Sequence, residues 1–268
     1  MFQPRNRWIV NIILVLAVLA FVGVSLLPII GAFNKSTSEQ KSTSETGVAS
    51  TSKLEDEARG LELVLQREPD NQTALKSLLE ARLLLLRQHK TNIQAVIEPL
   101  EKLAKLNPEN TQYTVLLAQA KLEIGDKEGA ASAYRSILQT KPGDIKALEG
   151  MVTLLVNQKR PEAAIGLLQD TLTAAKANKI QPAESVDKIA VQVLLGNVYA
   201  SQKRYNQALS VYDQAIKDDG QDFRPVLAKA MLLKKQGKID EAKPLFNKAA
   251  SLAPSQYKDE INKNASSR

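Results

Sequence analysis

A spacing of 34 residues recurs along the C-terminal part of the chain, and it constrains the fold more than any other feature. Like residues stand 34 positions apart in four pairs: Pro108 and Pro142, Ala208 and Ala242, Tyr212 and Phe246, and Ala215 and Ala249. Residues 54–268 are helical in pattern throughout and contain no alternating, strand-like run. A unit of this length cannot bury its apolar face alone, so the pattern predicts an all-α solenoid of stacked helix pairs.

The clearest unit, residues 189–222, carries small and aromatic residues at defined places. Leu195 and Gly196 stand in its first helix, and Ala208 and Tyr212 stand in its second. This pattern resembles the tetratricopeptide repeat family, in which each 34-residue unit forms a helix–turn–helix. Gly196, Ala208 and, in the next unit, Ala242 are predicted to lie where helices cross, because a larger side chain would force the helices apart.

The resemblance implies a solenoid of about four repeats with capping helices, spanning residues 54–268. The predicted segments are a leading helix at 54–70, units at 71–110, 111–144, 145–188, 189–222 and 223–254, and a C-terminal cap at 255–268. Two units are longer than 34 residues, because residues 87–92 lengthen a turn and residues 176–188 form an insertion.

The N-terminal part of the chain has the pattern of a membrane anchor. No charged residue occurs in residues 8–34, and residues 9–33 follow a basic flank at 1–8. Roughly 20 apolar residues cross a hydrocarbon core about 30 Å thick, so we predict a single transmembrane helix at 9–33. A cleaved signal peptide is disfavoured because its apolar region is shorter, about 7–15 residues, and a buried soluble helix because no face is polar. Flanking positive charges are nearly balanced, so the sequence leaves the topology open.

Residues 34–53, between the anchor and the repeats, are dominated by serine and threonine. Such a segment cannot bury enough apolar surface to offset the entropy lost on ordering, so a flexible, disordered linker is predicted. A flexible chain of this length spans roughly 25 Å root-mean-square. The repeats are therefore expected close to a membrane surface.

Composition argues against catalysis and nucleic-acid binding. The chain has no cysteine and one histidine, His89, which disfavours thiolate or multi-histidine metal centres and cysteine nucleophiles. Its 12 glycines are scattered singly, so no phosphate-binding loop is present. Aromatic residues make up 4% of the chain, and part of the net charge of +7 flanks the apolar segment. We therefore predict a non-enzyme with no cofactor, no metal, no small-molecule substrate and no nucleic-acid partner.

The family pattern places the first helix of each unit along a concave groove, where other proteins bind. The candidate groove residues are Gln119, Glu123, Asn157, Asn197, Ser201, Arg224, Met231, Lys234 and Lys235. The lining becomes basic toward the C-terminus, which predicts an acidic peptide segment as the ligand, although a solvated helix face is the alternative. One subset of the family grips the carboxylate tail of chaperones with lysine, arginine and asparagine. Asn197 and Arg224 stand at two of those positions, but Val193 and Ala228 occupy two others.

Residues 5–28 also resemble the anchors of cyanobacterial and chloroplast tetratricopeptide proteins that have one N-terminal span. Those proteins act in photosystem assembly or interact with the light-dependent protochlorophyllide reductase. The resemblance implies a scaffold at the thylakoid membrane, with its repeats on the cytoplasmic or stromal side. The alternative is an envelope protein whose repeats serve cell-wall or secretion machinery outside the cytoplasm.

Overall fold

A computed structural model describes residues 45–177 and 186–267, and every regular element in these ranges is helical. The chain divides into two compact units, residues 1–99 and 100–268, which are treated separately below. The predicted flank at 1–8, the predicted span at 9–33 and most of the predicted linker lie outside the described residues. Among the helices that are described, none has the length and apolarity needed to cross a membrane.

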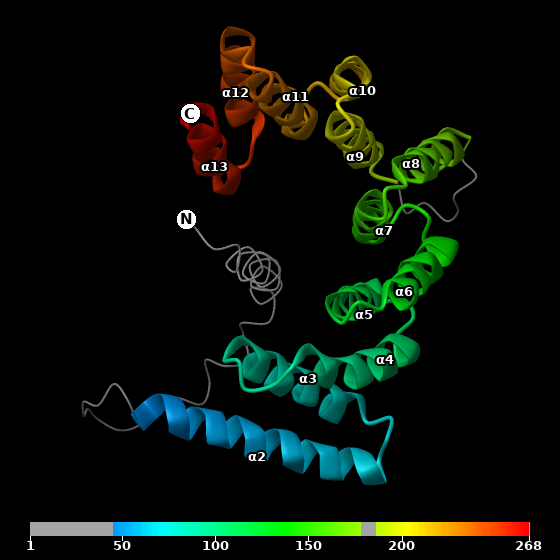
Figure 1. Cartoon of the computed structure of the whole chain (residues 1–268), viewed down its shortest axis with the longest axis vertical. Coiled ribbons are helices and arrows are strands. Elements are labelled where there is room, and N and C mark those ends of the chain that lie inside the picture. Colours follow the sequence, from blue (N-terminus) through cyan, green and yellow to red (C-terminus); the bar gives the residue numbers. More distant parts are fainter. Residues whose placement is uncertain (1–44, 178–185, 268) are drawn as a thin grey trace. The chain divides into compact units, whose positions relative to one another are not determined.

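The first unit contains a long helix, α2 (Glu45–Arg67), packed on α3 (Gln72–Arg87) (Figure 1). After α3 come a 3-10 turn, η4 (Ile93–Val96), and α4 (Ile97–Leu106), which continues into the second unit. The prediction of a disordered linker is wrong for residues 45–53, because α2 begins at Glu45. The Thr51 hydroxyl donates to Gln88 Oε1 at 2.8 Å. The part of α2 that precedes the predicted start at residue 54 therefore contacts the end of α3.

The second unit stacks four helix pairs and a final helix, as the repeat pattern predicts (Figure 1). The pairs are α5 (Thr111–Glu123) with α6 (Lys127–Thr140), α7 (Ile145–Asn157) with α8 (Pro161–Lys176), α9 (Lys188–Ser201) with α10 (Tyr205–Asp218), and α11 (Phe223–Lys235) with α12 (Ile239–Leu252). Part of the insertion predicted at 176–188 lies outside the described residues. The last helix is α13 (Ser255–Ser266), within the predicted C-terminal cap.

Each first helix begins at an asparagine or aspartate that caps its N-terminus. The side-chain oxygens of five residues accept hydrogen bonds from backbone N–H groups in the first turn: Asn71, Asn110, Asp144, Asp187 and Asp222. Such a cap satisfies a donor that the helix leaves unpaired and contributes about 1 kcal/mol. These five residues therefore fix where each first helix begins.

Each first helix also ends in the same left-handed turn. Among the described residues, five have positive φ, between 57° and 83°, and each is the second residue after its helix: His89, Gly125, Lys159, Lys203 and Gly237. Around Lys203, for example, the N–H of Arg204 donates to Tyr199 O at 2.9 Å and the N–H of Lys203 donates to Ala200 O at 3.1 Å. This is the Schellman motif, which satisfies the last carbonyls of a helix. The turns are therefore equivalent, although only two of them contain glycine.

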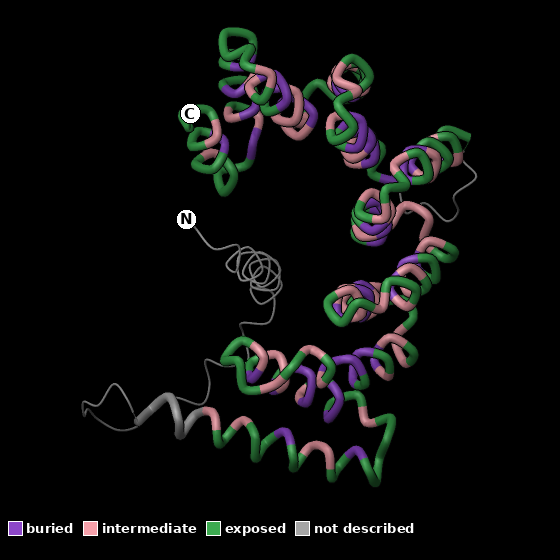
Figure 2. The backbone as a smooth tube through the Cα atoms, viewed as in Figure 1, coloured by how far each residue is buried: buried purple, intermediate pink, exposed green. Residues whose placement is uncertain are grey.

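Packing within the pairs depends on small residues facing aromatic ones. Ala208 and Ala242 are buried, and a Cβ atom added at Gly196 would lie 2.3 Å from Tyr212 Cε1. The prediction that Gly196, Ala208 and Ala242 lie at helix crossings is confirmed. Burial raises the pKa of the Tyr212 hydroxyl above its ordinary value. Figure 2 shows buried residues alternating with exposed ones along each helix, as in amphipathic helices that pack side by side.

The final helix closes the stack by lying beside α11. The ring of Tyr257 stacks on that of Phe223, with centroids 5.3 Å apart, near the start of α11. At the other end of α11, the Lys234 ammonium donates to the backbone oxygen of Asn264. The two contacts show that α13 runs parallel to α11, with Ile261 buried. Its composition is otherwise polar, which suits a helix that covers the last apolar face.

Candidate functional site

Neighbouring first helices contact one another in the second unit, which makes them a continuous layer. The contacts join α5 to α7, α7 to α9 and α9 to α11. All nine candidate groove residues lie on these four helices. The layer therefore brings residues that are far apart in sequence onto adjacent helices.

Two groups of candidate residues take equivalent places on successive helices. Glu123, Asn157, Ser201 and Lys235 are the last residues of α5, α7, α9 and α11, and all four are exposed. One turn earlier lie Gln119, which is half-buried, and Asn197 and Met231, which are exposed. The Ser201 hydroxyl donates to Val198 O of its own helix at 2.7 Å. These two rows offer mainly polar groups, with an apolar side chain at Met231 and a cation at Lys235.

Arg224 is already engaged by two carboxylates. Its guanidinium donates to both oxygens of Asp187, with Nη1–Oδ2 at 2.6 Å and Nη2–Oδ1 at 3.0 Å, and to Asp222 Oδ2 at 2.5 Å. Since Asp187 and Asp222 cap α9 and α11, Arg224 ties the starts of two neighbouring first helices. Hydrogen bonds with Asp222 and then with Asp187 raise the pKa of Arg224 above its ordinary value.

The pKa of Asp187 reflects the same contact. Burial by itself would raise it, but hydrogen bonds from the Arg224 guanidinium and the Ala190 N–H together bring the pKa below its ordinary value. Asp187 is therefore the charged partner of Arg224 at neutral pH. An acidic ligand would have to compete with it for the guanidinium.

Lys234 also has hydrogen-bond partners within the chain. Besides Asn264 O, its ammonium donates to Ser267 Oγ at 2.9 Å, and it lies 5.9 Å from the centre of the Phe246 ring. Lysine beside the last carbonyls of a helix stabilises that end. Lys234 therefore fastens α13 to the last repeat, and Lys235 is left as the exposed cation of this pair.

Asn197 keeps only part of its hydrogen-bonding capacity for a ligand. Its Oδ1 accepts from the Tyr212 hydroxyl at 2.7 Å, which leaves the amide nitrogen to donate. Val193 and Ala228, which depart from the chaperone-tail pattern, are half-buried apolar residues. With Arg224 also neutralised, the described residues supply little of a carboxylate clamp at this place.

Sequence reasoning missed a polar contact inside the third helix pair. Gln192 is buried, and its Nε2 donates to Asp218 Oδ2 at 2.7 Å, while Gln214 Nε2 donates to the other oxygen at 2.7 Å. These two bonds lower the pKa of Asp218 below its ordinary value, with Gln192 the larger cause. Gln192 occupies a position where the family expects a large apolar side chain, and that departure was visible in the sequence. Its role here is to tie α9 to α10.

No group of three or more histidine, aspartate or glutamate side chains within residues 45–177 and 186–267 is placed to hold a metal ion. His89 is an exposed residue of the left-handed turn after α3.

Comparison with known proteins fits this architecture. A family model described as tetratricopeptide repeat matches residues 65–252. The chain belongs to the tetratricopeptide repeat family. The crystal structure of yeast Tom70 superposes with a TM-score of 0.53 at 16% identity, covering 85% of this chain and 43% of that one, which shows a shared fold.

Two relatives are similar in sequence. The protein SLOW GREEN 1, chloroplastic, from Arabidopsis thaliana is 28% identical over 197 residues, which cover 74% of this chain and 60% of the relative. Cellulose synthase operon protein C from Pseudomonas fluorescens is 26% identical over 153 residues, covering 57% of this chain and 12% of that protein. The chain thus matches less than two thirds of the length of either relative.

Proposed function

We propose that this protein is a membrane-anchored scaffold that holds or recruits partner proteins on the face formed by its first helices. The observation that carries the proposal is the continuous layer of α5, α7, α9 and α11, with exposed side chains at equivalent places, in a family whose members bind other proteins. The apolar segment at 9–33 is proposed as the anchor. Lys235 is proposed to contact an acidic residue of the partner, and Met231 is proposed to contact an apolar residue of the partner.

We further propose a thylakoid location, with the repeats on the cytoplasmic or stromal side and a role in photosystem assembly or pigment biosynthesis. This proposal is supported by the similarity to a relative whose name places it in the chloroplast, together with the anchor-like N-terminal segment. The second candidate is an envelope scaffold that serves cell-wall or secretion machinery. The similarity to a cellulose synthase operon protein favours that candidate.

Acidic substitutions on the first-helix face test the binding role. Proteins that co-purify with the full-length chain from membranes are compared with those of Met231→Glu and Lys235→Glu variants. Lys243→Glu, at an exposed position on α12, is the control, because it changes the same charge on a second helix. We expect the first two variants to lose partners that the control retains. Equal capture by all three variants would contradict binding at this face.

Single cysteines test the membrane side, since the chain contains no cysteine of its own. Ser132→Cys places a thiol at an exposed position of α6, and Ser42→Cys places one in the predicted linker. A membrane-impermeant maleimide should leave both unlabelled in intact cells and should label both in thylakoid vesicles whose cytoplasmic or stromal face points outward. Labelling in intact cells would favour the envelope candidate instead.

A further inference from the structure

The left-handed turns give the five first helices a common register, and Arg82 departs from it. Seven positions before the turn residue, four helices carry a buried apolar residue or glycine: Ala118, Val152, Gly196 and Ala230. In α3 the same position, seven before His89, is Arg82. An arginine therefore stands where the other first helices meet their second helix.

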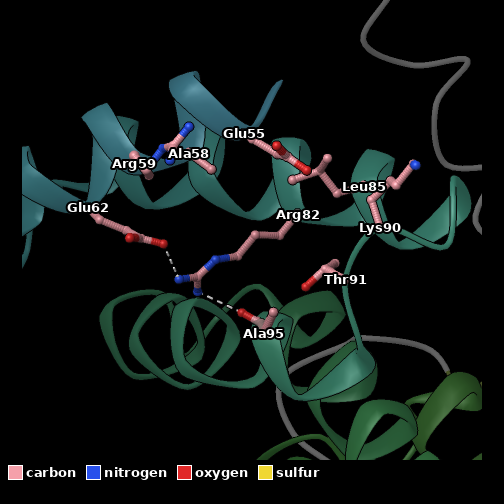
Figure 3. A pocket seen from close by; sticks show the side chains of 9 residues that line it. All are labelled: Glu55, Ala58, Arg59, Glu62, Arg82, Leu85, Lys90, Thr91 and Ala95. Atoms are coloured by element: carbon pink, nitrogen blue, oxygen red, sulfur yellow. Dashed lines mark hydrogen bonds and ion pairs between the residues drawn. The ribbon is translucent and has the colours of Figure 1, made fainter. Parts of the chain in front are cut away.

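A hollow opens around this arginine because the turn that follows α3 is longer. Seven positions separate His89 from Val96, the next buried residue, whereas five separate Gly125 from Ala130. The longer turn contains η4, and a hollow of about 310 Å³ lies between α2, α3 and the segment 90–95 (Figure 3). Its lining residues are Glu55, Ala58, Arg59, Glu62, Arg82, Leu85, Lys90, Thr91 and Ala95.

Arg82 is fixed in the hollow, whereas its carboxylate partner is not. The Arg82 side chain is 15% exposed, and its Nη1 donates to the backbone oxygen of Ala95 at 2.6 Å. Its Nη2 donates to Glu62 Oε1 at 2.7 Å, but the Glu62 side chain, on the surface of α2, is 44% exposed. Ion pairs with an exposed partner contribute little net stability, so Glu62 can turn into solvent at small cost. Arg82 would then present its guanidinium to another anion without moving.

The lining indicates what that anion is. Glu62 shows that a carboxylate fits against the guanidinium, whose planar fork pairs well with such groups. Of the three cations in the lining, Arg59 is paired with Asp56 at 2.6 Å, which leaves Arg82 and Lys90 beside Glu55 and Glu62. Once Glu62 turns into solvent, an excess of one positive charge remains, which suits a single negative group. The Thr91 hydroxyl is a further donor, while Ala58, Leu85 and Ala95 offer apolar wall to the chain that carries the anion.

We propose that this hollow in the first unit binds a carboxylate of a partner protein, which displaces Glu62 from Arg82. The carboxylate is either the C-terminus of the partner or an acidic side chain. The site is separate from the first-helix face of the second unit, so it does not depend on the function proposed above. Arg82 makes the ion pair, and the Ala95 carbonyl positions Arg82.

Titration calorimetry on the full-length chain tests the proposal with three acetylated tripeptides. One, Ala-Ala-Leu, has a free C-terminus, the second is its C-terminal amide, and the third is an amide with a central glutamate. We expect at least one carboxylate peptide to bind and the uncharged amide to bind about 10-fold more weakly or not at all, as for loss of a charge-assisted hydrogen bond. The peptide that binds better identifies the source of the carboxylate.

Variants on either side of the ion pair decide whether the displacement occurs. Glu62→Gln removes the competing carboxylate and should tighten binding several-fold, while Arg82→Gln should weaken it about 10-fold or more. Lys76→Gln, at an exposed position of α3 outside the hollow, should leave the affinity unchanged.

Three results would overturn the proposal: no binding of either carboxylate peptide even to Glu62→Gln, binding that is insensitive to Glu62→Gln, or acetate binding as tightly as the peptides. Because Arg82→Gln also removes the bond to Ala95, its fold is checked by circular dichroism. Glu62→Gln keeps that bond and remains decisive if Arg82→Gln unfolds.

Discussion

Replacing Gly237 by alanine isolates the contribution of the left-handed turn to stability. Gly237 has φ of 78°, and a Cβ atom added there would meet nothing within 4 Å, so the cost arises in the backbone alone. The left-handed conformation costs an L-residue about 1–2 kcal/mol. Alanine also lowers the conformational entropy of the unfolded chain, which stabilises the folded state by about 0.4–1 kcal/mol. The free energy of unfolding should therefore fall by about 1 kcal/mol.

Gly166→Ala is the matched control for that substitution. Gly166 lies within α8 without a positive φ, and an added Cβ there would also meet nothing within 4 Å. Alanine is favoured over glycine in a helix by about 0.5–1 kcal/mol, so this variant should be more stable than the parent. The two substitutions are chemically identical, and their effects on stability should have opposite signs.

Urea unfolding of the full-length chain, followed by circular dichroism, measures both effects. Lys203→Gly provides a reciprocal test, because Lys203 adopts φ of 59° without being glycine, and glycine should relieve this strain. If Gly237→Ala is neutral or stabilising to the same extent as Gly166→Ala, the reasoning from turn geometry is refuted.

Three further predictions concern the packing and the ion pairs of the second unit. Gly196→Ala should destabilise by about 1–3 kcal/mol in urea unfolding, because its Cβ would lie 2.3 Å from Tyr212 Cε1, and an unchanged midpoint would contradict that packing. Arg224→Gln should cost about 1 kcal/mol after allowance for screening by solvent, measured in the same way, whereas a more stable variant would argue against the tie between helix starts. Because the pKa of Asp187 is lowered in the folded state, its stabilisation is present above about pH 4 and is lost as the pH falls through the lowered value. Acid unfolding of Arg224→Gln should accordingly show a smaller loss of stability below pH 4, and a loss equal to that of the parent would contradict this assignment.

The repeat register was predictable because it depends on local spacing. Gly196, Ala208 and Ala242 lie at helix crossings as expected, since only a small side chain fits where two helices approach closely. The turns after α7 and α9 were less visible, because Lys159 and Lys203 take a conformation usually assigned to glycine. Aligning all five turns reveals them, and the same alignment identifies Arg82 as an exception.

The charges of the candidate groove could not be assigned from sequence in the same way. Arg224 pairs with Asp187, 37 residues away, and Lys234 bonds to Asn264, 30 residues away. Whether a cation faces solvent or an internal partner depends on which helices lie side by side. The start of α2 shows a related limit, since serine and threonine composition favoured disorder where the chain is helical from Glu45 onward.

Site-specific photo-crosslinking tests most directly whether the first-helix face binds a partner protein at a membrane. A photoreactive residue is placed at Met231, which is 48% exposed on α11, and at Ser132, which is exposed on the second helix α6, as the control. Irradiation of intact membranes should give discrete crosslinked species from position 231 that are absent from position 132, and mass spectrometry would identify the partner. Absence of crosslinks at 231, or the same products from both positions, would contradict a protein-binding role for this face.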